Sequence, residues 1–161
     1  MLTNLIREFL DESIQLELNV SDLYQLFYSK FPEDSEFWWQ ISLEEINHAA
    51  LIRSINDLFL PDNILPQGVI QTQSSELHQV NRSIRDRISN YKLNSPSRFE
   101  AFSYAYEIEN SAGELHYELF MNENPVSNVE KIFQRLNGED KNHALRIDNY
   151  MKMNNIVKTG V

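Results

Sequence analysis

The sequence predicts an all-α protein, built as an antiparallel four-helix bundle with a long crossover between its second and third helices. Four long segments carry apolar residues in alternating steps of three and four, which is the spacing of helices packed at small crossing angles. No segment alternates apolar and polar residues with a period of two between hairpin turns, so strands are not needed. At 161 residues, we expect a single domain covering 1–161.

The two helices of the first hairpin are predicted on either side of Pro32, because proline cannot continue a helix. The first covers about Asn4–Ser29, and the second starts at Asp34 or Ser35 and ends near Phe59. Their core-facing positions are Ile6, Leu10, Ser13, Glu17, Val20, Tyr24 and Phe27, followed by Trp38, Ile41, Glu45, His48, Ile52, Ile55 and Phe59.

The second hairpin is predicted around Pro125. Its first helix follows the segment Asn94–Ser97, and its second begins near Ser127 or Asn128. The core-facing positions are Phe99, Phe102, Tyr106, Glu109, Gly113, His116 and Phe120, followed by Val129, Ile132, Leu136, Asp140, His143, Ile147 and Tyr150.

The crossover between the hairpins covers about Leu60–Leu93. Its first residues, 60–68, read as an irregular loop, and Ser74–Tyr91 reads as a short polar helix with Leu77 and Ile84 on one side. A short link, a long crossover and another short link describe two antiparallel hairpins in one bundle.

Composition excludes several classes of function. The net charge of −10 makes nucleic acid and anionic membranes unexpected partners, since both attract clustered lysines and arginines. The chain has no cysteine, so disulfides, thiol catalysis and iron–sulfur clusters are excluded, and redox chemistry would need a bound metal or cofactor. No apolar run approaches 18 residues, and charges interrupt the N-terminal apolar run, so we expect a cytoplasmic protein.

Each predicted core-facing row carries one carboxylate at mid-length, and two rows carry a histidine three residues later. Residues i and i+3 lie on one helix face, so the two side chains of each Glu/Asp-x-x-His pair can bind the same metal ion. Four ionised carboxylates in an apolar core would be costly and would repel one another, whereas two divalent cations balance their charge of −4. The residues are Glu17, Glu45, His48, Glu109, Asp140 and His143.

The six candidate ligands are predicted to lie at the same height along the bundle. In an antiparallel hairpin, facing residues are equidistant from the turn. Glu17 and the Glu45/His48 pair are centred near Pro32, and the corresponding residues of the second hairpin are centred near Pro125. Both hairpins should therefore bring their polar groups to one level, which scattered charges would have no reason to do.

The sequence resembles the rubrerythrin-like members of the ferritin-like superfamily. The motifs are LELNVSDLYQLF (16–27), FWWQISLEEINHAALI (37–52), YEIENSAGELHYELF (106–120) and GEDKNHALRI (138–147). One carboxylate from each of two helices and a Glu-x-x-His motif from each of the other two form the dinuclear site of such bundles. The resemblance covers the four helices and not the crossover.

The resemblance implies a set of metal ligands and a cofactor. It makes Glu17, Glu45, His48, Glu109, Asp140 and His143 the ligands. Glu45 or Glu109 would bridge two iron ions, for which manganese or zinc could substitute. Tyr24 and His116, seven residues after a ligand, are candidates to support the ligands. Haem is not expected, because Ile46 stands where bacterioferritin has its haem-binding methionine.

The resemblance also implies an activity, namely reduction of hydrogen peroxide or dioxygen in defence against oxidative stress. The chain lacks the four-cysteine module of full rubrerythrins, so electrons would come from a separate donor protein. Bundles of this type commonly pair, so a homodimer is among the expected partners, and the adjacent Trp38 and Trp39 are compatible with such an interface.

Two departures keep alternatives open. Ala112 stands where rubrerythrins have an extra glutamate that switches with redox state, which favours an iron-binding or storage protein without efficient turnover as the alternative function. Asp140 is one methylene shorter than the usual glutamate, so Glu139 could compete with it for the metal. A bundle kept for protein interaction, with a vestigial site, is a third hypothesis.

Overall fold

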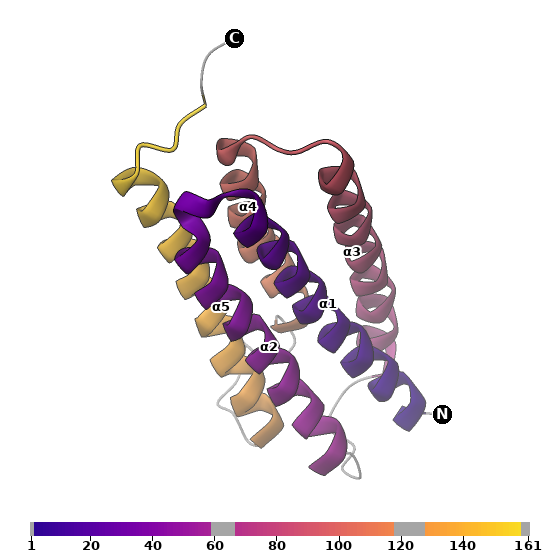
Figure 1. Cartoon of the computed structure of the whole chain (residues 1–161). Coiled ribbons are helices and arrows are strands. Elements are labelled where there is room, and N and C mark those ends of the chain that lie inside the picture. The colour runs from indigo at the N-terminus through magenta and orange to yellow at the C-terminus, as the bar shows by residue number, and fades with distance from the viewer. Residues whose placement is uncertain (1, 59–66, 118–127, 159–161) are drawn as a thin grey trace.

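Five α-helices pack together in the computed structural model, which describes residues 2–58, 67–117 and 128–158, with side chains for 4–55, 73–111 and 131–158 (Figure 1). The regular elements, in order, are α1 (Leu2–Lys30), the 3-10 turn η1 (Pro32–Asp34), α2 (Ser35–Leu58), α3 (Gln67–Leu93), α4 (Arg98–Tyr117) and α5 (Asn128–Met153). Within these ranges there is no strand, and no helix is both long and apolar enough to cross a membrane. The all-α prediction is confirmed.

Helices occupy all four predicted places, and local chemistry explains their ends. Pro32 lies in the 3-10 turn between α1 and α2, where Asp34 donates a backbone hydrogen bond to the carbonyl of Phe31. Ser97 caps α4, because its hydroxyl accepts from the backbone N–H of Glu100 while the Glu100 carboxylate accepts from the N–H of Ser97. The predicted turn residue Pro125 lies outside the described residues.

The prediction of a short helix in the crossover was wrong. α3 has 27 residues and begins at Gln67, inside the segment that reads as an irregular loop. Pro66 and Gly68 favour a loop at this place in the sequence, but the helix includes Gly68. Its inward face also includes polar residues. Buried Asn81, for example, accepts a hydrogen bond from the Asn19 amide of α1 at 2.9 Å and donates one to the Glu12 carbonyl at 2.9 Å.

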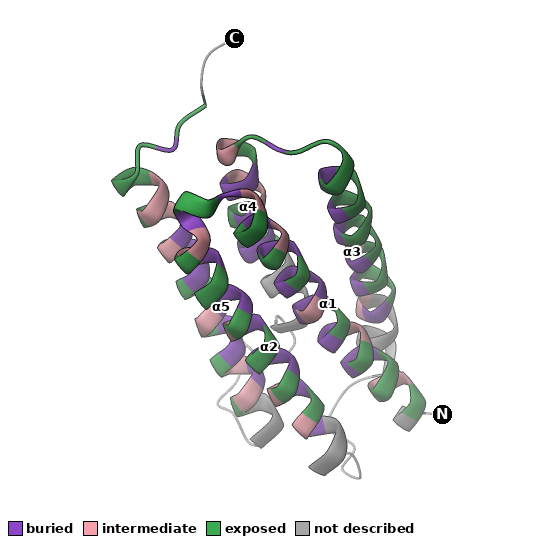
Figure 2. Cartoon of the chain, viewed as in Figure 1, coloured by how far each residue is buried: buried purple, intermediate pink, exposed green. Residues whose placement is uncertain are grey.

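The packing places α1 against both α2 and α3, and α4 against α5 (Figure 1). Every helix turns a buried face inward and an exposed face outward, as the purple and green stripes of Figure 2 show. Aromatic rings fill the core near the α1–α2 turn. The largest fully buried side chains are Trp38, Tyr24, Phe9, Phe27, Phe102 and Phe133.

An ion pair between a buried carboxylate and a partly exposed arginine joins the α1–α2 turn to the second hairpin. The side chain of Asp34 is fully buried, and both carboxylate oxygens accept hydrogen bonds from the Arg98 guanidinium of α4, at 2.7 and 2.6 Å. The Tyr150 hydroxyl of α5 donates to the same carboxylate at 3.0 Å. These contacts fix the turn relative to α4 and α5.

Candidate metal centre

The six predicted ligand residues lie on the inward faces of their helices and come together in the interior. Glu17 comes from α1, Glu45 and His48 from α2, Glu109 from α4, and Asp140 and His143 from α5. All six are buried, with no more than 6% of any residue exposed. Their donor atoms form two groups of metal-ligand type, and Glu45 belongs to both.

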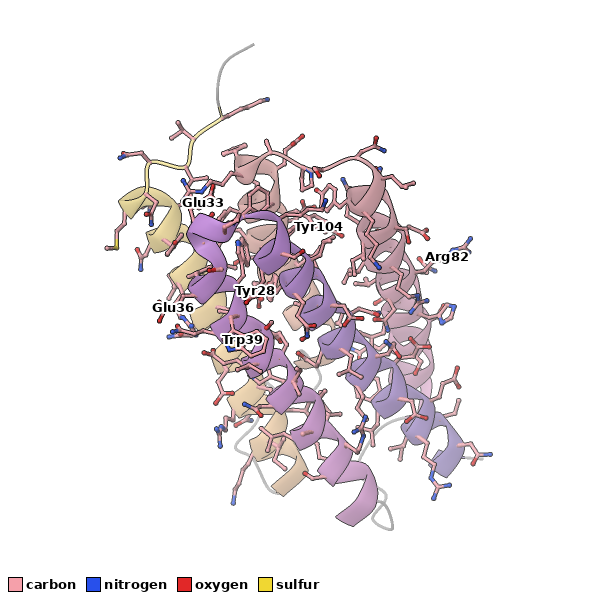
Figure 3. The ribbon with its side chains drawn as sticks, viewed as in Figure 1. Tyr28, Glu33, Glu36, Trp39, Arg82 and Tyr104 are labelled. Atoms are coloured by element: carbon pink, nitrogen blue, oxygen red, sulfur yellow. The ribbon has the colours of Figure 1, made fainter. Side chains whose placement is uncertain are left out.

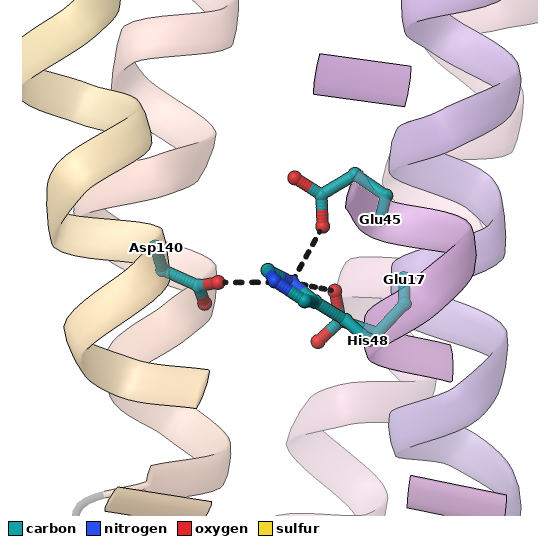
Figure 4. A group of neighbouring side chains, drawn as sticks. All are labelled: Glu17, Glu45, His48 and Asp140. Carbon is teal, nitrogen blue, oxygen red and sulfur yellow. Dashed lines mark ion pairs between the residues drawn. The ribbon is translucent and has the colours of Figure 1, made fainter. Parts of the chain in front are cut away.

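The first group surrounds the Nδ1 atom of His48. Carboxylate oxygens of Glu17, Glu45 and Asp140 lie 3.5, 3.2 and 3.5 Å from it. Figure 4 shows these carboxylates, from α1, α2 and α5, converging on the imidazole. Asp140 therefore lies with the histidine of α2 and not with His143 of its own helix.

The second group surrounds the Nδ1 atom of His143. A Glu45 oxygen lies 2.7 Å from it and a Glu109 oxygen lies 3.6 Å from it. The two imidazoles are stacked, with ring centroids 5.3 Å apart and planes 12° from parallel. The two groups are thus neighbours, joined by the carboxylate of Glu45, which was one of the two residues expected to bridge.

The donor atoms fit a metal ion better than they fit one another. Within each group they lie within 4.8 Å of one another. Yet Nδ1 of both histidines, Oε1 of Glu45 and Oδ1 of Asp140 are buried and make no aligned hydrogen bond. Around a metal bound at about 2.1 Å, neighbouring ligand atoms are about 3.0–3.4 Å apart. The residues present could therefore hold metal ions.

The outer nitrogens of the two histidines are held by a second pair of carboxylates. Nε2 of His48 lies 2.9 Å from Glu139 of α5, and Nε2 of His143 lies 2.7 Å from Glu44 of α2. Arg135 donates to Glu139 at 2.7 Å. Glu139 therefore contacts the outer side of an imidazole, whereas the sequence left it open as a rival of Asp140 for the metal.

Glu44 was missed by the sequence interpretation. It forms an ion pair with Arg146 as well as contacting His143. The pattern that could have found it is positional, because Glu44 and Glu139 each stand immediately before the carboxylate of a ligand pair. The hydrogen bond from His143 and the ion pair with Arg146 lower the pKa of Glu44 to about 2.

Tyr24 is the one supporting candidate whose side chain is described. It is fully buried, and its hydroxyl donates to Oε1 of Glu109. Burial and the nearby Glu109 and Glu45 carboxylates raise the pKa of Tyr24 well above its usual value, so the phenol keeps its proton. The side chains of His116 and Ala112, also singled out in the sequence, lie outside the described part of α4.

The neighbouring carboxylates favour the charged form of both histidines. Burial opposes a charge on His48, but contacts with Glu17 and Glu45 raise the pKa of its imidazole to about 11. Burial also opposes a charge on His143, while Glu109 and Glu45 raise its pKa well above the usual range. A metal that binds Nδ1 must therefore displace a proton from each imidazole.

The pKa values of two central carboxylates, Asp140 and Glu45, shift in opposite directions. Burial, reinforced by the carboxylates of Glu17 and Glu109, raises the pKa of Asp140 well above its usual value. Burial and Glu109 act in the same direction on Glu45, but its contacts with both histidines leave its pKa lowered. The shared residue Glu45 is thus the one held ionised by both imidazoles.

A cavity of about 340 Å³ opens between α2 and α5 beside the two imidazoles. It lies on the side of Nε2, away from the converging Nδ1 atoms. Its walls combine polar and charged side chains with one leucine. The lining residues are Glu44, Asn47, His48, Leu51, Arg135, Glu139, Asn142 and His143.

No protein-family model, curated protein or solved structure matches this chain. The chemistry of the site therefore has to be read from its own residues and their geometry.

Proposed function

We propose that the protein is a di-iron oxidoreductase of the rubrerythrin-like class, which reduces hydrogen peroxide or dioxygen. One observation carries the proposal. Six buried ligand-type side chains from four helices converge in two groups that share Glu45. Nδ1 of each histidine faces the shared carboxylate without an aligned hydrogen bond, which is the arrangement that a bound metal ion would complete.

The arrangement of the helices supports a ferritin-like bundle. α1 packs on α2, α4 packs on α5, and α3 lies between these pairs in the chain. This is the order expected for two antiparallel hairpins joined by one long crossover. In such a bundle, the metal ligands come from facing helices at mid-height, which supports the same role for these six side chains.

The donor set supports iron as the native metal. Four carboxylates and two neutral imidazoles suit iron or manganese, and zinc accepts the same ligands. Two divalent cations would balance the four negative charges without the two imidazole protons. A bound ferrous pair would supply the two electrons that reduce peroxide to water.

The residues of this chain would bind, orient and enclose that pair. Glu44 and Glu139 keep the imidazole protons on Nε2, so both Nδ1 lone pairs face inward. The Tyr24 hydroxyl orients Glu109 through its hydrogen bond. A separate donor protein would restore the electrons.

Anaerobic reconstitution with ferrous iron tests the proposal. We expect two iron ions per chain, fast oxidation when peroxide is mixed in, and repeated turnover once a reductant is supplied. Glu45→Ala should lose both ions, whereas Glu107→Gln on the exposed side of α4 should behave as the wild type. Less than one ion per chain in the wild type would contradict the proposal.

Iron binding or storage without efficient turnover is the second candidate, favoured by Ala112 in place of a redox-switching glutamate. The same experiment separates the two functions. A storage protein would bind and oxidise iron once, with no acceleration by peroxide and no repeated cycles. Repeated cycles would exclude storage as the sole function.

A further inference from the structure

The two groups of ligand atoms differ in the number of donor atoms that the described side chains supply. The group around His48 has four donors, its own Nδ1 and one oxygen from each of three carboxylates. The group around His143 has three donors, its own Nδ1, Oε1 of Glu45 and Oε2 of Glu109. Glu45 cannot make the two groups equal, because its other oxygen, Oε2, lies 3.2 Å from Nδ1 of His48.

Tyr24 is the reason that Glu109 offers a single oxygen to the group around His143. Oε1 of Glu109 accepts the hydrogen bond of the Tyr24 hydroxyl, while Oε2 lies 3.6 Å from Nδ1 of His143. Both residues are buried, and the raised pKa of the phenol keeps it a donor. A carboxylate can bind one cation through one oxygen or through both. The hydrogen bond from Tyr24 therefore limits Glu109 to one oxygen.

The negative charges of the two groups differ in the same sense. Three carboxylates surround His48 and two surround His143, with Glu45 counted in both groups. A divalent cation beside His143 would therefore be neutralised less completely, and in a buried site the surplus positive charge attracts an anion. A metal ion with three protein donors also keeps a position for an external ligand, whereas four donors complete a tetrahedral set.

We propose that the metal ion of the group around His143 binds a small external anion, and that Tyr24 keeps the position for this anion free by holding the second oxygen of Glu109. The anion is of the class that binds a metal through one negatively charged atom, such as azide, hydroxide or deprotonated peroxide. This assignment rests on the proposed function, because the anion requires a bound metal. Tyr24 is then a positioning residue, which acts through Glu109.

Azide binding to the cobalt(II) form of the protein tests which group takes the anion. Cobalt accepts carboxylate and imidazole ligands, and its visible absorption changes when an external ligand joins. Glu17→Ala leaves the group around His143 intact and should bind azide, whereas Glu109→Ala leaves only the group around His48 and should not. Equal azide affinities, or the reverse order, would overturn this inference alone. A wild type that binds no cobalt would overturn the proposed function and this inference with it.

Tyr24→Phe tests the positioning role. It should raise the dissociation constant of azide by about tenfold, the size of effect typical of groups that orient metal ligands. Cobalt itself should bind more tightly, because Glu109 then supplies two oxygens; loss of a residue that only supports the fold would weaken cobalt binding. Unchanged azide affinity or weaker cobalt binding in Tyr24→Phe would overturn the role of Tyr24.

Tyr28→Phe is the matched control. It removes the same hydroxyl from the same helix, but Tyr28 is 44% exposed and packs its ring against Trp39, with centroids 5.7 Å apart. Figure 3 shows both side chains on the outer face of the α1–α2 pair. Tyr28→Phe should match the wild type in its affinity for azide and for cobalt. An equal change in both tyrosine variants would show that the effect is not specific to Tyr24, and would overturn its role.

Discussion

Glu44 of α2 accepts a hydrogen bond from Nε2 of His143 of α5 across 2.7 Å. The reciprocal contact joins Glu139 of α5 to Nε2 of His48 of α2 at 2.9 Å. Each helix therefore orients the imidazole of the other. A proton held on Nε2 leaves the Nδ1 lone pair for a metal, so the outer carboxylates determine which nitrogen can coordinate.

Replacing either outer carboxylate should weaken metal binding without removing a ligand. Glu44→Gln or Glu139→Gln leaves a weaker acceptor beside Nε2, and loss of such support typically costs 10–100-fold in metal affinity, as an order of magnitude. Titration of the metal against a competing chelator measures the change. Glu107→Gln, on the exposed side of α4, is the matched control. Equal affinities for all three variants would show that the outer carboxylates do not orient the histidines.

The sharing of Glu45 predicts how many ions each variant binds. Glu17 belongs only to the group around His48, and Glu109 only to the group around His143. Glu17→Ala and Glu109→Ala should therefore each retain about one ion per chain, whereas Glu45→Ala should retain none. Metal analysis after dialysis gives the count. Retention of one ion by Glu45→Ala would mean that the two groups are independent.

The helices of the two hairpins and the six inward residues could be predicted from spacing alone, although Tyr106, predicted to face the core beside Glu109, is exposed. Positions three and four apart share a helix face, so the period of the helix places each carboxylate in the core. Equal distances from the turns then place the carboxylates at one height, where their mutual repulsion calls for a cation. Neither of these two predictions requires knowledge of how the side chains pack.

Other features depend on packing and could not be predicted in this way. Glu44 lies off the row of core-facing positions, so its contact with His143 depends on how far α2 and α5 are rotated relative to each other. The same rotation places Asp140 beside His48. The start of α3 was missed because Pro66 and Gly68 favour a loop, whereas the helix includes Gly68.

The raised histidine pKa values predict the pH dependence of the metal-free protein. The pKa of His48 is about 11 when folded and about 6.5 when unfolded, so the folded state holds the extra proton between these values. The stabilising contribution is complete below about pH 6.5 and is lost as the pH rises toward 11. His143 acts in the same direction. Urea titrations should therefore show metal-free stability falling between pH 7 and 9.

Metal binding should remove this dependence and release protons. Because a coordinated imidazole has no proton on Nδ1, the loaded protein should keep nearly constant stability from pH 7 to 9. Calorimetry in two buffers of different protonation enthalpy should show proton release on binding at pH 7. Identical pH profiles for the metal-free and loaded protein, with no proton release, would mean that the histidines are not ligands.

Among the described ion pairs made by lysine or arginine, that of Asp34 with Arg98 should be the most sensitive, because its carboxylate is fully buried. Arg98→Ala would leave the fully buried Asp34 carboxylate without its two guanidinium hydrogen bonds, which should cost about 1–3 kcal/mol because Arg98 itself is partly exposed. Lysine cannot reproduce the two-pronged contact, so Arg98→Lys should recover only part of the loss. Urea denaturation measures both variants.

Lys152→Ala is the comparison, because its ion pair with Asp148 is exposed and should change stability by less than about 0.5 kcal/mol. A loss in Arg98→Ala no greater than in Lys152→Ala would show that Asp34 finds other partners or water. The Asp34 contacts also fix the α1–α2 turn against α4 and α5, and the relative height of the helices decides whether the six ligands meet. Arg98→Ala should therefore weaken metal binding as well as stability, although Arg98 contacts none of the ligands among the hydrogen bonds and ion pairs described.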